Sequence, residues 1–295
     1  MSVPVVEPTT IHMPSLARDY LARAEELFGK EFLGELCEEY DRGRSSRTPP
    51  EYPHRLARCL SEVRRAVANP IRGALVAVNE LGSILELFEP WRGDPIWPSL
   101  LRSLVNPSEF IHALFTLAAA RHLAADDQKV ELCDEIEGRR SYDIRIVKPG
   151  LDHILAVEIK TPAELRRDWY LARGRSFGDQ DATRIIDKAL KSVGKGHEGQ
   201  LGDGKHGILV IGGFFPSRVE IWRLGEAAKK RLRKSEGREQ ILGILLVVIA
   251  IGRERVVWTP QLSLTSIELY SQERLASWTW YTPNPKYNGD GNINV

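Results

Sequence analysis

Two carboxylates and an ammonium lie at the ends of two neighbouring apolar segments of this chain. Asp143 is followed fifteen positions later by Glu158-Ile159-Lys160, which closes the apolar run 153–157. The stretch between them, 148–152, contains proline and glycine and indicates a turn. A hairpin folded there brings Asp143 beside Glu158. Because side chains alternate along a strand, Glu158 and Lys160 are expected to project from the same face.

Two adjacent carboxylates offer the oxygen ligands that Mg²⁺ prefers, with Mn²⁺ as the alternative ion. Lys160 is placed to meet a phosphate. A plainer interpretation is a surface aspartate and an ordinary Glu-x-Lys at a strand end. Charged side chains at the end of an almost wholly apolar strand are costly without a partner, which favours the metal site.

The same residues resemble the D…(D/E)-x-K signature of the PD-(D/E)XK nuclease superfamily, with Tyr142 where that pattern usually has proline. The family core runs helix, three-stranded meander, helix, strand. The order predicted here is similar and covers residues 105–255, about half of the chain. The resemblance implies an α/β fold with a restriction-endonuclease-like core, a mixed β-sheet flanked by helices. The predicted elements are a helix at 107–124, strands near 129–137, 142–147 and 153–160, a helix at 180–193 and a strand at 207–215.

The resemblance also assigns roles. It implies that Asp143, Glu158 and Lys160 are catalytic, and that Asp143 and Glu158 bind the metal through their side chains. Ile159 would add its backbone carbonyl, and Lys160 would contact the attacking water or the phosphate. Glu109 is a further candidate metal ligand, because many family members carry a glutamate on the helix before the sheet. Its alternative role is to cap that helix, which starts at 106–109.

Other acidic and basic residues have two interpretations each. Glu135 and Glu137 are alternative acids of the site or solvent-facing edge residues. Gln180, Arg184 and Lys188 form one polar stripe on the helix after the motif, and they are either nucleic-acid-binding residues or a solvated helix face. The same choice applies to the basic stretches 229–234 and 166–167, the latter beside Trp169 and Tyr170. The net charge is only +1, so any nucleic-acid surface is a local patch.

The chain is expected to have three parts. Residues 1–100 form an all-helical module with helices at 14–40, 54–68 and 71–88, and residues 282–295 form a flexible tail. Residues 101–281 form the nuclease-like domain. Its further predicted elements are strands at 218–223, 240–251 and 255–258 and a basic helix at 225–235.

Several functions are excluded by context. The G-x-G-x-x-G match at 194–199 and the G-x-x-x-x-G-K match at 199–205 follow a helix and precede a strand, the reverse of a nucleotide-binding loop.

The three cysteines lack zinc-ligand spacing and indicate a cytoplasmic protein. The longest apolar run, 241–251, is too short to cross a membrane.

These observations predict a metal-dependent nuclease, and the resemblance favours DNA over RNA as its substrate. A homodimer is the simplest arrangement for cutting both strands with one site per chain. The alternatives are an inactive nucleic-acid-binding or interaction module that retains the nuclease fold, and a different hydrolase with a carboxylate pair.

Overall fold

A computed structural model describes eleven segments of the chain. They divide into two compact units at Glu89/Pro90, which are called here the helical unit and the sheet unit. The described residues are 13–44, 54–68, 74–123, 129–133, 142–147, 154–166, 178–193, 207–213, 218–232, 241–250 and 263–270.

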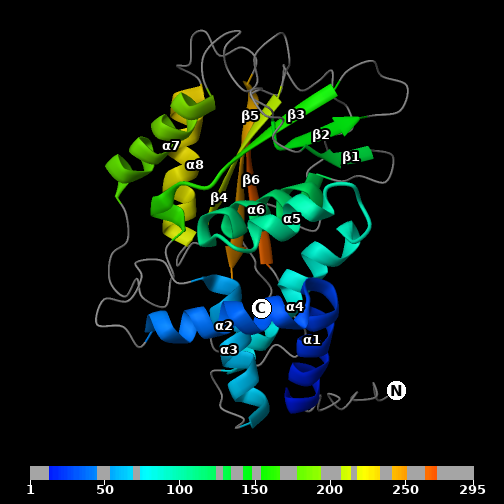
Figure 1. The fold of residues 1–295 in the computed structure, drawn as a ribbon. Coiled ribbons are helices and arrows are strands. Elements are labelled where there is room, and N and C mark those ends of the chain that lie inside the picture. The colour runs from blue at the N-terminus through cyan, green and yellow to red at the C-terminus, as the bar shows by residue number, and fades with distance from the viewer. Residues whose placement is uncertain are drawn as a thin grey trace, which may run out of the picture. The chain divides into compact units, whose positions relative to one another are not determined.

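The described residues of the helical unit form four helices (Figure 1), namely α1 (Met13–Phe28), α2 (Lys30–Arg44), α3 (Arg55–Ala68) and α4 (Ala74–Phe88). The predicted single helix at 14–40 is wrong, because the helix is interrupted at Gly29. This residue has φ +93°, a left-handed conformation that glycine adopts without a steric penalty and that ends helices. The short 3-10 helix η1 (Glu89–Trp91) spans the boundary of the two units.

In the sheet unit, the strands that the structure describes form one mixed six-stranded sheet and lie in sequence order. From β1 to β3 the strands are antiparallel, β3, β4 and β5 are parallel to one another, and β6 returns antiparallel to β5. The strands are β1 (Lys129–Leu132), β2 (Ile144–Val147), β3 (Ile154–Lys160), β4 (Gly207–Gly213), β5 (Ile241–Ala250) and β6 (Ser263–Tyr270).

Helices connect and cover these strands (Figure 1). They are α5 (Trp97–Ser103), α6 (Pro107–Leu123), the 3-10 helix η2 (Ala163–Leu165), α7 (Asp179–Val193) and α8 (Arg218–Leu232). The predicted order of helix, three strands, helix and strand is therefore present as α6, β1, β2, β3, α7 and β4. The predicted strand at 218–223 is wrong, because those residues begin α8. Leu224 and Ala228, one turn apart, are both buried, so the segment packs as one amphipathic helix.

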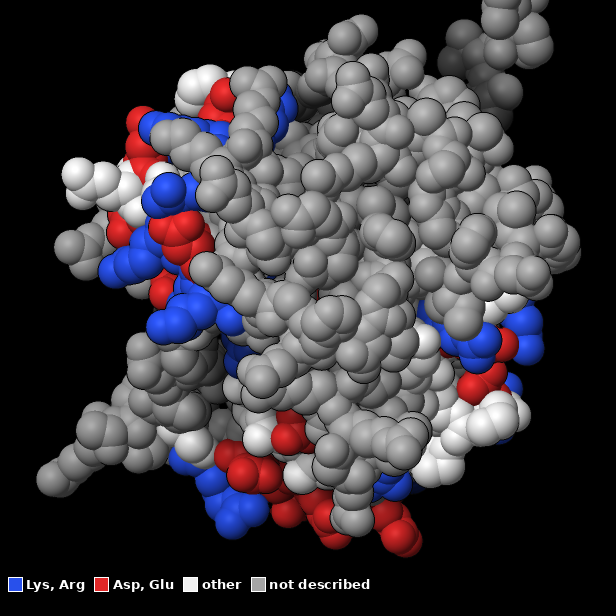
Figure 2. Space-filling view, turned by 90° about the horizontal axis from the view of Figure 1, so that it is seen from above, with Lys and Arg blue, Asp and Glu red and all other residues white. Residues whose placement is uncertain are grey.

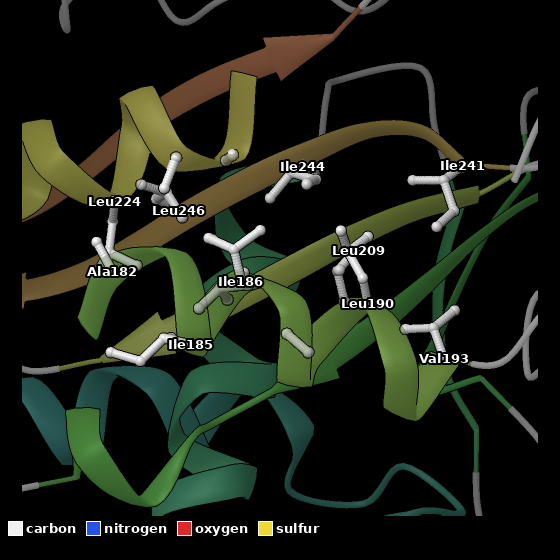
Figure 3. Close-up of a cluster of buried hydrophobic side chains, with 14 of the residues drawn as sticks. Ala182, Ile185, Ile186, Leu190, Val193, Leu209, Leu224, Ile241, Ile244 and Leu246 are labelled. Carbon is white, nitrogen blue, oxygen red and sulfur yellow. The ribbon is translucent and has the colours of Figure 1, made fainter. Parts of the chain in front are cut away.

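Each face of the sheet has its own helical cover. A buried cluster joins α7 and α8 to one face, and Ile186 and Leu190 of α7 lie near Leu209 of β4 in Figure 3. The opposite face meets α6, because a Cβ built on Gly212 of β4 would lie 2.5 Å from Cγ of Phe115. Side chains alternate along β4, so Leu209 and Gly212 face opposite sides. Both faces of the central strands are thus buried.

Within the part of the chain that the structure describes, no helix has the length and apolarity needed to cross a membrane. Several predictions fall outside that part. They concern Glu135 and Glu137, the stretch 167–170, the loop 194–206, the basic residues 233–234, the strand at 255–258 and the tail 282–295.

Candidate active site

The backbone of Asp143 is held between two strands, at the point where β2 begins. Its N–H donates to the carbonyl of Val157 at 3.0 Å, and its own carbonyl accepts from Cys133 N at 2.9 Å. The β2–β3 register pairs Ile144 with Val157, so the hairpin predicted from 143–160 is formed. Asp143 thus lies alongside the end of β3 that carries Glu158.

Both oxygens of the Asp143 carboxylate are engaged. Oδ2 accepts from the backbone N–H of Ile159 at 2.6 Å, and Oδ1 lies 2.9 Å from Nε2 of His112 on α6. An ionised carboxylate can only accept, so with Asp143 ionised the imidazole Nε2 is the donor in this contact. Asp143 thereby joins α6 to β3 across two hydrogen bonds.

Glu158 is buried, with only 1% of its surface exposed, although it is an acid. Its Oε1 accepts from Nζ of Lys160 at 2.5 Å, which confirms that the two side chains share a face. Its Oε2 has no hydrogen-bond partner in the described structure. Burial, and then the nearby charge of Asp143, raise the pKa of Glu158 to about 7, against the opposing effect of Lys160.

This arrangement fits a bound cation. Without a cation, ionised Glu158 has one desolvated oxygen and a negative neighbour, and both disfavour its charge. A divalent ion next to Glu158 and Asp143 would reverse both effects. The described residues contain no group of three or more His, Cys, Asp or Glu side chains placed to hold a metal. Mg²⁺ does not require one, because it is commonly bound by one or two carboxylates and several waters.

The first turns of α6 carry Glu109 and His112, which differ in their surroundings. Asn106 caps the helix, with Oδ1 accepting from Ser108 N at 2.8 Å and from Glu109 N at 3.4 Å. Glu109 itself is exposed. One turn further on, His112 of this helix contacts Asp143. Sequence reasoning missed His112, although its spacing of three from Glu109 puts the two on the same side of the helix.

Immediately after the motif, an arginine fixes the backbone. Arg166 Nε donates to the carbonyl of Thr161 at 2.5 Å, and its Nη2 donates to Thr161 Oγ1 at 3.1 Å. Thr161 is 4% exposed. Arg166, which the sequence offered as a phosphate-binding residue, therefore also holds the turn that follows Lys160.

The proposed nucleic-acid stripe on α7 is exposed, and its two cations are paired with acids. Arg184 Nη2 lies 3.1 Å from Asp181 Oδ1, and Lys188 Nζ lies 3.5 Å from Glu164 Oε1 in η2. Gln180 is exposed in the first turn of the helix. Figure 2 shows the same mixture more widely, with blue and red side chains interspersed among the coloured residues. A nucleic acid would have to compete with these acids for the cations.

Comparisons with family models, with curated proteins and with solved structures found no match.

Proposed function

We propose that this protein is a metal-dependent nuclease that hydrolyses phosphodiester bonds, with DNA as its substrate. The observation that carries the proposal is the carboxylate pair. Glu158 is buried beside Asp143 with one oxygen lacking a hydrogen bond, and Lys160 adjoins it. Acids whose pKa is raised by burial and by a neighbouring like charge are enriched at functional sites.

The arrangement of elements supports the same proposal. A helix, three antiparallel strands, a crossover helix and a parallel strand occur in the order of the PD-(D/E)XK core. The Asp and Glu-x-Lys positions of the signature fall on the second and third of those strands or at their ends. A restriction-endonuclease-like core is therefore part of the proposal.

In this proposal Asp143 and Glu158 hold Mg²⁺ or Mn²⁺, together with the carbonyl of Ile159. The metal supplies Lewis-acid polarisation of the phosphate and a more acidic bound water. Lys160 presents its ammonium to the same place, where it can neutralise charge that develops on the phosphate. Burial of Glu158 excludes water from one side of the site and strengthens these electrostatic contacts.

A cleavage assay tests the proposal on the full chain. Wild type, Asp143→Asn and Lys160→Met are incubated with supercoiled, linear and single-stranded DNA and with RNA, with Mg²⁺, Mn²⁺ or EDTA. We expect wild type to cut DNA only with a metal ion. Both variants should lose at least about 100-fold in rate, because Lys160→Met removes a donor to the transition state and Asp143→Asn removes a charged metal ligand. The matched control is Lys30→Met, which changes an exposed lysine in α2 of the helical unit.

The outcomes separate the rival functions. Metal-dependent cleavage of RNA alone would replace DNA as the substrate. Binding of nucleic acid with no cleavage under any metal would favour an inactive module that retains the fold. Undiminished cleavage by Asp143→Asn would remove the proposed site.

A further inference from the structure

His112 is the one side chain on α6 with an established contact to the Asp143 carboxylate among the described residues. We propose that His112 is a positioning residue, which donates from Nε2 to Asp143 Oδ1 and so fixes the orientation of this carboxylate for the metal. The inference rests on the proposed function for its purpose. The contact itself does not depend on it.

Two donors from different elements determine how the carboxylate is turned. Ile159 N on β3 binds Oδ2 at 2.6 Å, and His112 Nε2 on α6 binds Oδ1 at 2.9 Å. One donor alone would leave the carboxylate free to rotate about its Cβ–Cγ bond. With both in place the rotation is restricted, and the remaining lone pairs keep a fixed direction. A metal site gains affinity from such support of its ligands.

The donor is itself well anchored. Thr116 Oγ1 donates to the carbonyl of His112 at 3.0 Å, and the flanking residues Ile111 and Ala113 are buried. Further along the helix, Phe115 packs against Gly212 of β4. The imidazole is 39% exposed, so His112 contacts Asp143 from the partly solvent-exposed side of α6.

His112 acts through Asp143 rather than as a further ligand. Its Nε2 is already occupied by the contact with Oδ1. Moreover, His112, Asp143 and Glu158 do not form a three-ligand metal group in the described structure. His112 is therefore a hydrogen-bond donor to a proposed metal ligand. Any side chain that places an N–H where Nε2 lies should serve the same role.

The test compares three variants of the full chain. His112→Gln keeps a side-chain N–H, His112→Leu removes it, and His122→Leu is the matched control about 15 Å further along the same helix, at 1.5 Å per residue. Mn²⁺ binding is measured by calorimetry and by electron paramagnetic resonance, and thermal melting monitors folding. We expect His112→Leu to bind Mn²⁺ about 10- to 100-fold more weakly. The Gln and His122→Leu variants should bind close to wild type.

The results distinguish this inference from the proposed function. Equal Mn²⁺ affinity of wild type and His112→Leu, or equal weakening by Leu and Gln, would overturn the positioning role. Failure of wild type to bind Mn²⁺ would instead contradict the proposed function. In that case, and also if His112→Leu does not fold, ¹⁵N NMR spectra of metal-free wild type test which imidazole nitrogen of His112 carries the proton. We expect a proton on Nε2 of His112, and a proton on Nδ1 alone would overturn the inference.

Discussion

Nζ of Lys160 lies 2.5 Å from Oε1 of Glu158, so the lysine contacts the acid that we propose to bind metal. The side chain of Glu158 is 2% exposed and that of Lys160 is 23% exposed. The lysine thus supplies the positive charge that a metal ion would otherwise provide to one of the two glutamate oxygens. Removing either partner should change stability, with opposite signs.

Lys160→Met should destabilise the protein at high pH and much less at low pH. At pH 8 the variant leaves ionised Glu158 buried without the ammonium of Lys160, which costs up to about 3 kcal/mol in the free energy of unfolding. At pH 5 Glu158 is mostly protonated, since its pKa is about 7, and the free energy of unfolding changes little. Urea unfolding at the two pH values measures the difference. An equal loss at both would show that the lysine acts through packing alone.

Glu158→Gln should stabilise the metal-free protein at high pH. The pKa of Glu158 is raised from 4.5 to about 7, so its protonated form favours the folded state. The stability from this group is fully present below pH 4.5 and is lost as the pH rises through 7. The loss is about 3 kcal/mol, at about 1.4 kcal/mol for each tenfold change in proton affinity. Glutamine stays neutral and avoids it.

The measurement is the free energy of unfolding of wild type and Glu158→Gln between pH 4.5 and 8.5, in EDTA. The two should lie close together at pH 4.5, diverge between about pH 4.5 and 7, and keep a constant separation above pH 7. Glu226→Gln is the control, because Glu226 is an exposed glutamate on α8. Parallel curves for wild type and Glu158→Gln would contradict the raised pKa.

Gly212→Ala should destabilise the sheet unit. The added methyl group would lie 2.5 Å from Cγ of Phe115, so β4 and α6 would have to separate, at a cost of about 1–3 kcal/mol. Combining it with Phe115→Leu should cost less than the sum of the two single changes. Gly34→Ala is the control, since nothing lies within 4 Å of its added methyl group in α2. Chemical denaturation of all four variants measures the effect.

Glu80→Ala should destabilise the helical unit strongly. Glu80 on α4 pairs with Nε of Arg55 and, at 3.3 Å, with Nη2 of Arg58, and all three side chains are at most 7% exposed. Removing the shared carboxylate leaves two buried guanidinium groups, and breaking such a pair costs about 3–5 kcal/mol. Thermal unfolding checks this, with the exposed Glu35→Ala in α2 as control. A loss similar to that of Glu35→Ala would show that the buried cluster adds nothing.

Local patterns predicted much of the fold. Alternation and a turn were sufficient for the β2–β3 hairpin and for the shared face of Glu158 and Lys160, because these depend on residues close in the sequence. Helical periodicity likewise predicted α3, α6 and α7 to within a few residues. The break at Gly29 was missed, since the apolar spacing continues through it while the backbone does not.

Contacts between distant segments could not be read from such patterns. His112 and Asp143 are 31 residues apart, and their meeting depends on how α6 packs against the sheet. Burial of Leu224 and Ala228 made residues 218–223 the start of a helix, although their β-branched residues favour a strand. The pairing of Lys188 with Glu164 was equally hidden, because it requires α7 and η2 to be placed together. The pair of Arg184 and Asp181 is local, since these residues are three positions apart on α7.

β3 is paired on both sides, with antiparallel β2 and parallel β4. Each residue of 154–160 pairs with β2, with β4 or with both, and fraying starts at unpaired edges, so the hydrogen-bonded amide protons of β3 should exchange with solvent only when the sheet opens. Glu158 and Lys160 would then not unfold locally while the rest of the sheet stays folded. The proposed site would persist for as long as the native sheet does.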